Sequence, residues 1–283
     1  MAFKERAHNR KKDFSLTNLD FLAVGFTVVK ICFVVGILAP LPFLIEVLEW
    51  ERMKRDLHET QIRNEHAYFC TISQLLNQYI IKTWPTQPLE VENNHIYLVG
   101  ESHSMSSAYQ VISWHGKPTV LLPKLVTGCK CFHLRKDTRF YPKKNFHSVV
   151  DTIPPKSTVI FMFGEIDCRE GLLVSVERLK YSSVDEGMRT TIGYYMKELV
   201  KANEKFDLYV HPAPPVIDIT RDTVKMFNVF LQMECNKNGL RYLNFMEDYF
   251  TNNGKDLKKE LHLDNIHSSP AITKYVEQAL NKY

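Results

Sequence analysis

From residue 94 onward the chain alternates short apolar runs with longer segments of helical periodicity, and this alternation restricts the fold more than any other feature. The apolar runs are rich in β-branched and aromatic residues and are bounded by turn residues, as strands are. Strands separated by helices build a parallel sheet with helices on both faces. The strands are predicted at 95–99, 118–122, 158–163, 207–211 and 241–245, and the helices at roughly 105–115, 170–180, 186–204, 221–238 and 270–282.

The residues before this pattern divide into two segments. Residues 1–50 hold a basic start followed by a hydrophobic stretch, and residues 51–93 are predicted as a helical connector that ends in a turn at Pro85 and Pro88. Residues 94–283 then form the α/β domain. At 283 residues and 45% hydrophobic composition, the chain can bury the core that such a domain requires.

The hydrophobic stretch at 21–45 predicts a helix that crosses or touches a membrane, because about 20 apolar residues span a bilayer core. Lys30 is its only charged residue before Glu46, and such a lysine must reach the interface or face protein. Pro40 and Pro42 would end or bend a helix near its far end. A retained anchor is expected because no small-residue cleavage site follows. The alternative is an apolar helical hairpin packed on the domain or on a membrane surface.

The flanking charges predict how a span would be oriented. Basic residues precede the stretch and a mixture of acids and bases follows it, which favours a cytoplasmic N-terminus. The domain beyond about residue 50 would then be luminal or extracellular. No Asn lies in an Asn-x-Ser/Thr acceptor, so a cytoplasmic domain is the alternative. The preceding basic residues are Lys4, Arg6, Arg10, Lys11 and Lys12.

Composition excludes some partners. The net charge of +4 comes from 36 basic and 32 acidic residues that are interspersed along the chain, so we expect no nucleic-acid partner. Six cysteines are too few for a disulfide framework, although one or two bridges are compatible with the sequence. Cys129 and Cys131 are too close in sequence for a usual zinc pair, which favours core packing or a disulfide. No metal and no cofactor are predicted.

The sequence GESHS follows the first predicted strand and places a hydroxyl where that strand ends. Gly100 permits a tight turn, and Ser102 would lie beside the backbone N–H groups at the start of a helix. Ligands of parallel sheets bind at the carboxyl ends of the strands. Ser102 is therefore a candidate nucleophile. The alternative is that Ser102 or Ser104 only caps the helix.

The sequence LHLDNIHSSP, at 261–270, supplies the partners that such a nucleophile needs. Asp264 and His267 lie three residues apart, close enough for the carboxylate to orient the imidazole. The imidazole could then take a proton from Ser102. A Gly-x-x-Asp sequence at the end of the third predicted strand, within GEIDCR, strengthens this reading.

These blocks resemble, in their order and in the sites they occupy, those of the SGNH (GDSL-like) hydrolase superfamily over roughly residues 94–280. The resemblance implies a flavodoxin-like, three-layer α/β fold shared by esterases, lipases and carbohydrate acyl-esterases. GESHS is similar to the first block, with Ser102 as nucleophile, and LVTGCK to the second, with the Gly128 N–H joining that of Ser102 in an oxyanion hole. GEIDCR is similar to the third block and DNIH to the last, with Asp264 orienting His267. The blocks also resemble an uncharacterised eukaryotic subgroup.

One departure from the family pattern concerns catalysis. Ile166 occupies the position of an Asn whose side chain gives the family a third oxyanion donor, and a missing donor commonly costs about two to three orders of magnitude in rate. Arg169 and His103 are the nearest substitutes in sequence. Glu165 and Asp167 would hold such a donor by charge-assisted hydrogen bonds. The alternative is an ion-paired strand end that only shapes the pocket.

The sequence therefore predicts a serine-dependent acyl-ester hydrolase that acts on a small-molecule or glycan ester, such as an acylated carbohydrate or lipid. If an alcohol instead of water captures the acyl-enzyme, the same residues make an O-acyltransferase for glycan hydroxyls. The third alternative, which Ile166 favours, is a binding protein that kept the fold and lost efficient chemistry.

Overall fold

The computed structural model describes residues 17–54, 56–77, 94–178, 180–251 and 254–283. The chain divides into two compact units, one at the N-terminus and one that contains the sheet. The basic residues at 4–12 and the predicted turn at Pro85 and Pro88 lie outside the described residues.

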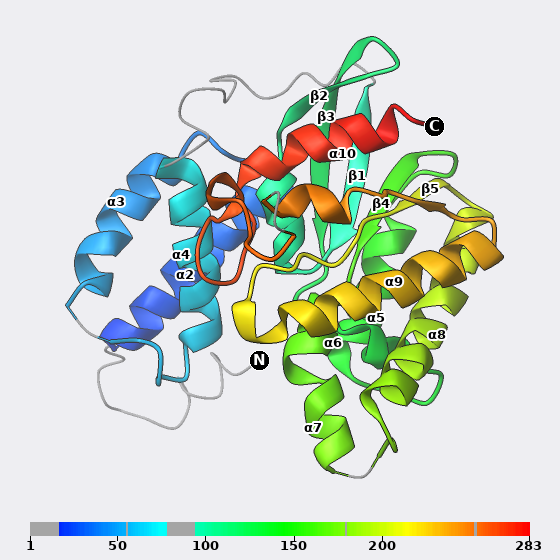
Figure 1. Ribbon diagram of the computed structural model, residues 1–283. Helices are drawn as coiled ribbons and strands as arrows, with labels where there is room; N and C mark the ends of the chain where they lie inside the picture. Colours follow the sequence, from blue (N-terminus) through cyan, green and yellow to red (C-terminus); the bar gives the residue numbers. More distant parts are fainter. Residues whose placement is uncertain (1–16, 55, 78–93, 179, 252–253) are drawn as a thin grey trace. The chain divides into compact units, whose positions relative to one another are not determined.

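The second unit contains a six-stranded sheet with the order β2-β3-β1-β4-β5-β6 (Figure 1). Only β2 is antiparallel to its neighbour, and the other pairs are parallel. Without β2 the order is 2-1-3-4-5, which is the flavodoxin-like order, so the predicted α/β fold is confirmed. The strands are β1 (His95–Gly100), β2 (Val111–Trp114), β3 (Lys117–Leu125), β4 (Thr158–Met162), β5 (Asp207–Val210) and β6 (Arg241–Tyr242).

Helices cover the sheet in two layers. The crossovers from β3 to β4, β4 to β5 and β5 to β6 advance in one direction along the sheet. Because such connections are right-handed, α5, α8 and α9 lie on the same face of the sheet. Figure 1 shows these helices grouped together and α10 lying apart beside β2, which it contacts. The α-helices of this unit are α5 (Tyr141–Asp151), α6 (Glu165–Glu170), α7 (Leu172–Glu177), α8 (Val184–Asn203), α9 (Arg221–Lys237) and α10 (Thr273–Leu280).

Short 3₁₀ turns occupy the strand ends and connections of the same unit. Two of them, η2 and η3, follow β1 and β3 and belong to the candidate site. The turns are η2 (Ser102–Ser107), η3 (Cys131–Leu134), η4 (Asp218–Thr220), η5 (Met246–Tyr249), η6 (Lys259–Leu261) and η7 (Pro270–Ile272).

The helix predicted at 105–115 is wrong. After η2 the chain forms β2, which pairs with β3 through a two-residue turn at His115 and Gly116. Both turn residues have positive φ, of 50° and 73°, as a type I′ hairpin requires. The helix predicted at 170–180 is replaced by the shorter α6 and α7, which meet at Gly171.

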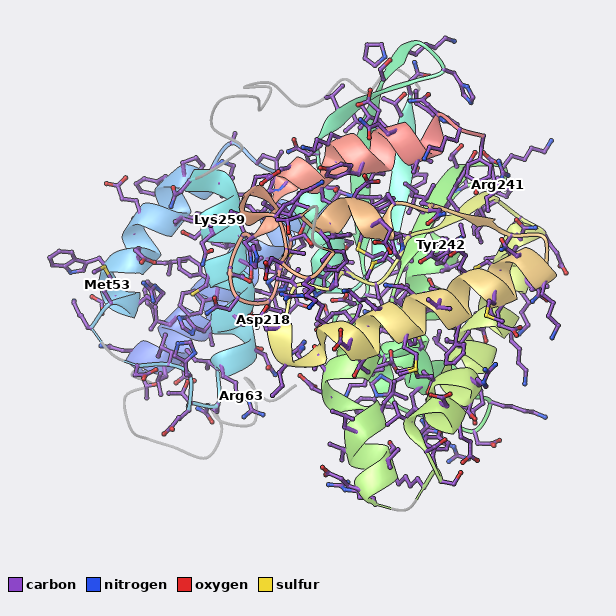
Figure 2. All side chains as sticks on the ribbon, viewed as in Figure 1. Met53, Arg63, Asp218, Arg241, Tyr242 and Lys259 are labelled. Atoms are coloured by element: carbon purple, nitrogen blue, oxygen red, sulfur yellow. The ribbon has the colours of Figure 1, made fainter. Side chains whose placement is uncertain are left out.

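One strand is shorter than predicted, and one helix was not predicted. The strand at 241–245 is reduced to the two residues of β6, Arg241 and Tyr242, which are labelled in Figure 2. Arg241 pairs with Asp207 and donates to the Tyr209 hydroxyl at 2.7 Å. Helix α5 was not predicted. It begins with Pro142 in its first turn, a position that suits proline because the missing N–H would be unpaired there.

The described residues of the N-terminal unit form the helices α2 (Asn18–Val35), α3 (Leu41–Arg52) and α4 (Arg63–Leu75). The predicted hydrophobic helical segment at 21–45 is present but is divided into two helices, because α2 ends at Gly36 in the left-handed conformation and α3 begins after Pro40, a residue at which a helix was expected to end or bend. Lys30 lies over the Tyr68 ring, with Nζ 4.8 Å from its centroid, so its charge faces protein. By length and composition α2 is apolar enough to span a membrane.

The sheet register brings the ends of β1, β3 and β4 together. Gly100 is level with Leu125 on one side and with Met162 on the other. The segments that follow these residues therefore start side by side at the carboxyl edge of the sheet. They contain GESHS, LVTGCK and GEIDCR.

Candidate active site

Ser102 is the first residue of η2, two residues after β1 ends at Gly100. Gly100 precedes this turn at a close approach between strands, because a Cβ there would lie 2.7 Å from the carbonyl oxygen of Met162. Glu101 caps the turn, and its carboxylate accepts the His103 N–H at 3.2 Å. The Ser102 side chain is half-buried and reaches the site surface.

His267 connects Ser102 to Asp264. Its Nε2 atom lies 3.0 Å from Ser102 Oγ, and its Nδ1 atom lies 2.9 Å from Asp264 Oδ2. Ser102 and His267 are 165 residues apart in the chain, so the fold creates this contact. A hydroxyl, an imidazole and a carboxylate in this line can transfer a proton during acyl transfer.

Asp264 is held as a carboxylate. Its Oδ1 atom accepts the backbone N–H groups of Ile266 at 2.7 Å and His267 at 2.6 Å. Burial alone would raise the pKa of Asp264, but the hydrogen bond and charge of His267, with these N–H donors, lower it to about 2. The carboxylate therefore fixes a proton on His267 Nδ1 and leaves Nε2 toward Ser102.

Two backbone N–H groups in the segments that follow β1 and β3 are open. Within the described parts of the chain, neither the Ser102 N–H nor the Gly128 N–H donates a hydrogen bond. Gly128 lies three residues beyond the end of β3 with φ of 61°, and the Val126 N–H bonds to Gly100 O at 2.7 Å. This bond ties the loop of Gly128 to the turn of Ser102, and open N–H groups are the donors that an oxyanion requires.

Asp167 contacts a different loop. Its carboxylate accepts the Cys131 N–H at 2.7 Å and the Phe132 N–H at 3.0 Å. The side chain is buried, which raises the pKa of Asp167 to about 6 although these N–H groups lower it. Asp167 thus fixes η3, just beyond Gly128. The sequence analysis had instead predicted that Asp167 would hold a substitute oxyanion donor.

Glu165, Arg169 and His103 form one buried network of charges. Arg169 Nε lies 3.1 Å from Glu165 Oε1, and its Nη1 lies 2.8 Å from Glu170 Oε1. Burial would raise the pKa of Glu165, but His103 and then Arg169 hold it below its usual value. The Arg169 guanidinium is therefore occupied by carboxylates.

His103 lies beneath His267. Its Nε2 atom is 3.3 Å from Glu165 Oε2, and its ring centroid is 4.9 Å from that of His267. Burial opposes a charge on this imidazole, but Glu101 and then Glu165 outweigh it and raise the pKa of His103. These carboxylates favour the protonated form of the His103 ring. Ile166, which is 8% exposed, offers no donor.

The sequence interpretation did not include Glu101 among the site residues. Its Oε2 atom lies 2.9 Å from Ser102 Oγ, and its side chain is fully buried. The sequence signal that could have identified Glu101 as a site residue was its position directly before the candidate nucleophile, Ser102.

Other features lie near but outside this group. A cavity of about 200 Å³ is bounded by η3, α6, α7 and α8, and Asp167 lines it while Ser102 and His267 do not. No disulfide joins the six cysteines, all of which lie in the described part of the chain, and Cys129 and Cys131 are buried. Among the described residues no group of three or more His, Cys, Asp or Glu side chains is placed to hold a metal ion.

No family model matches the chain, and no curated protein matches it. Among solved structures it is similar to a variant of an acetyl xylan esterase from Geobacillus stearothermophilus, with 13% identity, a TM-score of 0.45, and coverage of 67% of this chain and 94% of the esterase. It is also similar to an alpha/beta hydrolase from the metagenome of Lake Arreo, with 10% identity, a TM-score of 0.44, and coverage of 66% of this chain and 93% of the hydrolase. A third similar structure is a GDSL-like lipase from Bacteroides thetaiotaomicron, with 14% identity, a TM-score of 0.42, and coverage of 67% of this chain and 86% of the lipase. The fold itself rests on the strand order and register given above.

Proposed function

We propose that the chain is a serine ester hydrolase. The observation that carries this proposal is the line from Ser102 Oγ to His267 Nε2 at 3.0 Å and from His267 Nδ1 to Asp264 at 2.9 Å. A strand end and a C-terminal loop supply its members, at the edge where parallel sheets bind ligands.

In the proposed reaction Ser102 Oγ attacks an ester carbonyl while His267 Nε2 takes the hydroxyl proton. The tetrahedral intermediate collapses, the C–O bond to the alcohol breaks, and His267 returns the proton to the leaving oxygen. Water, activated by His267, then attacks the acyl-enzyme and releases the acid and Ser102. Asp264 keeps the imidazole in the required tautomer throughout.

The oxyanion of the intermediate would be bound by the Ser102 and Gly128 N–H groups. Arg169 is held by two carboxylates and His103 is buried under His267, so neither supplies the donor that Ile166 lacks. A site with two donors instead of three is expected to be slower by about two to three orders of magnitude. The substrate we propose is an acylated carbohydrate or lipid, as the resemblance of the four blocks implies.

Fluorophosphonate labelling of the full-length chain tests this proposal, because the reagent reports an activated serine without knowledge of the substrate. Intact mass would compare the wild type with Ser102→Ala and His267→Ala. Ser104→Ala is the matched control, because the Ser104 hydroxyl donates to the Glu101 carbonyl at 2.8 Å instead of facing the imidazole.

A single adduct that is lost in both site variants and kept in Ser104→Ala is the expected result. Product analysis with acyl esters and glycan acceptors would then separate a hydrolase from an O-acyltransferase. If the folded wild type forms no adduct, the hydrolase proposal is wrong, and a binding protein with a degenerate site is the remaining function.

We also propose that the N-terminal unit associates with a membrane and leaves the sheet-containing unit luminal or extracellular. The support is α2, with a mean hydropathy of 1.9 and one exposed apolar row at helical spacing. Protease protection of the second unit in sealed vesicles tests the orientation, and release of the chain by alkaline wash would contradict stable insertion. The row consists of Phe21, Val24, Val28, Ile31 and Val35.

A further inference from the structure

The Ser102 hydroxyl has two acceptors and one proton. Its Oγ atom lies 3.0 Å from His267 Nε2 and 2.9 Å from Glu101 Oε2. Both distances are those of hydrogen bonds. A triad requires only the first of them, so the second contact needs its own explanation.

Proton counting limits how both contacts are filled. Asp264 is a carboxylate and fixes a proton on His267 Nδ1, so Nε2 is either bare or carries a second proton. If Ser102 donates to Glu101, then Nε2 must carry that proton to fill its contact with Oγ. If Ser102 donates to a bare Nε2, then Glu101 must be a neutral acid that donates to Oγ.

Glu101 lies among basic groups. The side chain is fully buried, Oε2 also accepts the His103 N–H, and Oε1 has no hydrogen-bond partner in the described part of the chain. The charged or titratable groups that face it are the His103 imidazole, the Arg169 guanidinium and the Cys129 thiol. Both bases attract a negative charge on Glu101, and Glu165 is the nearest competitor for them.

We propose that Glu101 is a second proton acceptor for Ser102, so that the free site binds a proton along the line from His267 Nε2 through Ser102 Oγ to Glu101 Oε2. Each atom of this line then has a donor or an acceptor: Nε2–H donates to Oγ, and Oγ–H donates to Oε2. Loss of that one proton leaves Nε2 bare and able to act as a base.

This arrangement adds a specific control to the site. A carboxylate accepts a hydrogen bond more strongly than a neutral imidazole does, so Glu101 turns the hydroxyl away from His267 in the resting state. Its effect on rate rests on the proposed hydrolase function. The position of the protons does not, and a spectroscopic measurement reports it separately.

Three variants of the full-length chain test the proposal. Glu101→Gln keeps the size of the side chain and an oxygen for the His103 N–H but removes the charge. Ser102→Ala removes the middle of the line and leaves Glu101 intact. Glu170→Gln is the matched control, since it removes a carboxylate from the exposed end of the same network, where Glu170 binds Arg169.

The first readout is nitrogen NMR of histidine-labelled protein across pH. We expect wild type and Glu170→Gln to give the same pH dependence of the His267 Nε2 signal, and Glu101→Gln and Ser102→Ala to lose the proton on Nε2 at a lower pH than either. The second readout is the fluorophosphonate rate against pH. Its acid limb is expected to lie lower in Glu101→Gln, so that at a pH on this limb the variant reacts about tenfold faster than wild type.

The outcomes separate the two proposals. If Glu101→Gln and Ser102→Ala both titrate like Glu170→Gln, Glu101 accepts no proton from Ser102 and the inference is wrong. If Glu101→Gln does not fold, the comparison of Ser102→Ala with wild type decides the question. If no protein forms an adduct, the hydrolase proposal fails while the NMR comparison still tests the proton line.

Discussion

Replacing Asp264 by Asn separates the chemical role of this carboxylate from its structural one. The substitution is isosteric and keeps one oxygen for the backbone N–H groups of Ile266 and His267. It puts an amide N–H₂ where a carboxylate oxygen faced His267 Nδ1, at 2.9 Å in the wild type. An amide that donates to Nδ1 favours the tautomer with the proton on Nε2, which cannot accept the proton of Ser102.

The structure gives a magnitude for each effect. The pKa of Asp264 is about 2 instead of 3.8, and at about 1.4 kcal/mol per pKa unit the charged carboxylate stabilises the folded state by roughly 2 kcal/mol at neutral pH. Because the folded-state pKa is depressed, this contribution is present above pH 3.8 and is lost as the pH falls through about 2. The wrong tautomer in the type case of such a triad costs about 10⁴ in rate.

Two assays on the same preparations test this reasoning. Urea unfolding at pH 7 should place Asp264→Asn about 2 kcal/mol below wild type, and the gap should close as the pH approaches 2. Fluorophosphonate labelling should be slower by about three to four orders of magnitude. Asp137→Asn, at an exposed aspartate, is the control for both. A variant that loses stability but labels within tenfold of wild type would show that Asp264 does not orient His267.

Two further substitutions probe the frame of the site. The pKa of Asp167 is raised by burial to about 6, so its contribution to stability is full below 3.8 and falls as the pH rises through 6, by up to about 3 kcal/mol. Denaturant titrations from pH 4 to pH 7 should show this decline in wild type and not in Asp167→Asn, and equal slopes would contradict the assignment. Gly164 has φ of 121° and a Cβ there would lie 2.3 Å from Phe227, so Gly164→Ala should lose about 2–5 kcal/mol. Gly193→Ala, in α8 with nothing within 4 Å of its Cβ, should stay within about 1 kcal/mol of wild type, and equal melting temperatures for the two variants would refute the steric account.

The strands that are buried on both faces could be predicted from the sequence, because their apolar runs are bounded by turn residues. β1, β4 and β5 agree with the predicted ranges to within a residue. The long helices α8 and α9 were predicted for the same kind of reason, since each repeats apolar residues at helical spacing over four turns or more.

The segment after Ser102 shows where periodicity fails. Val111 to Trp114 is only four residues long, which is too short for apolar spacing to separate a strand from a helix. Tertiary pairing with β3 decides the outcome, and the dipeptide His115-Gly116 was the available signal for a hairpin. Pro142 was a similar signal for the start of α5, a helix that the sequence analysis did not predict.

The order of the site residues could be read from the sequence, but their partners could not. Asp167 and Asp264 are both aspartates within short sequence blocks, GEIDCR and DNIH. Asp167 accepts two N–H groups of η3, whereas Asp264 binds the His267 imidazole. Asp167 and its donors are separated by about 35 residues. A single sequence does not encode such a pairing locally, because it depends on which strand ends become neighbours.

The position of His267 is set by backbone bonds rather than by its side-chain partners alone. The Leu263 N–H bonds to His267 O at 3.0 Å and the Ser269 N–H to Leu261 O at 2.9 Å, which closes the loop that presents the imidazole. The Thr273 hydroxyl then donates to Ser107 Oγ at 3.1 Å and ties the start of α10 to η2, the turn that carries Ser102. Because proton transfer requires placement to within about half an ångström, these bonds explain how a nucleophile and a base 165 residues apart remain at hydrogen-bond distance.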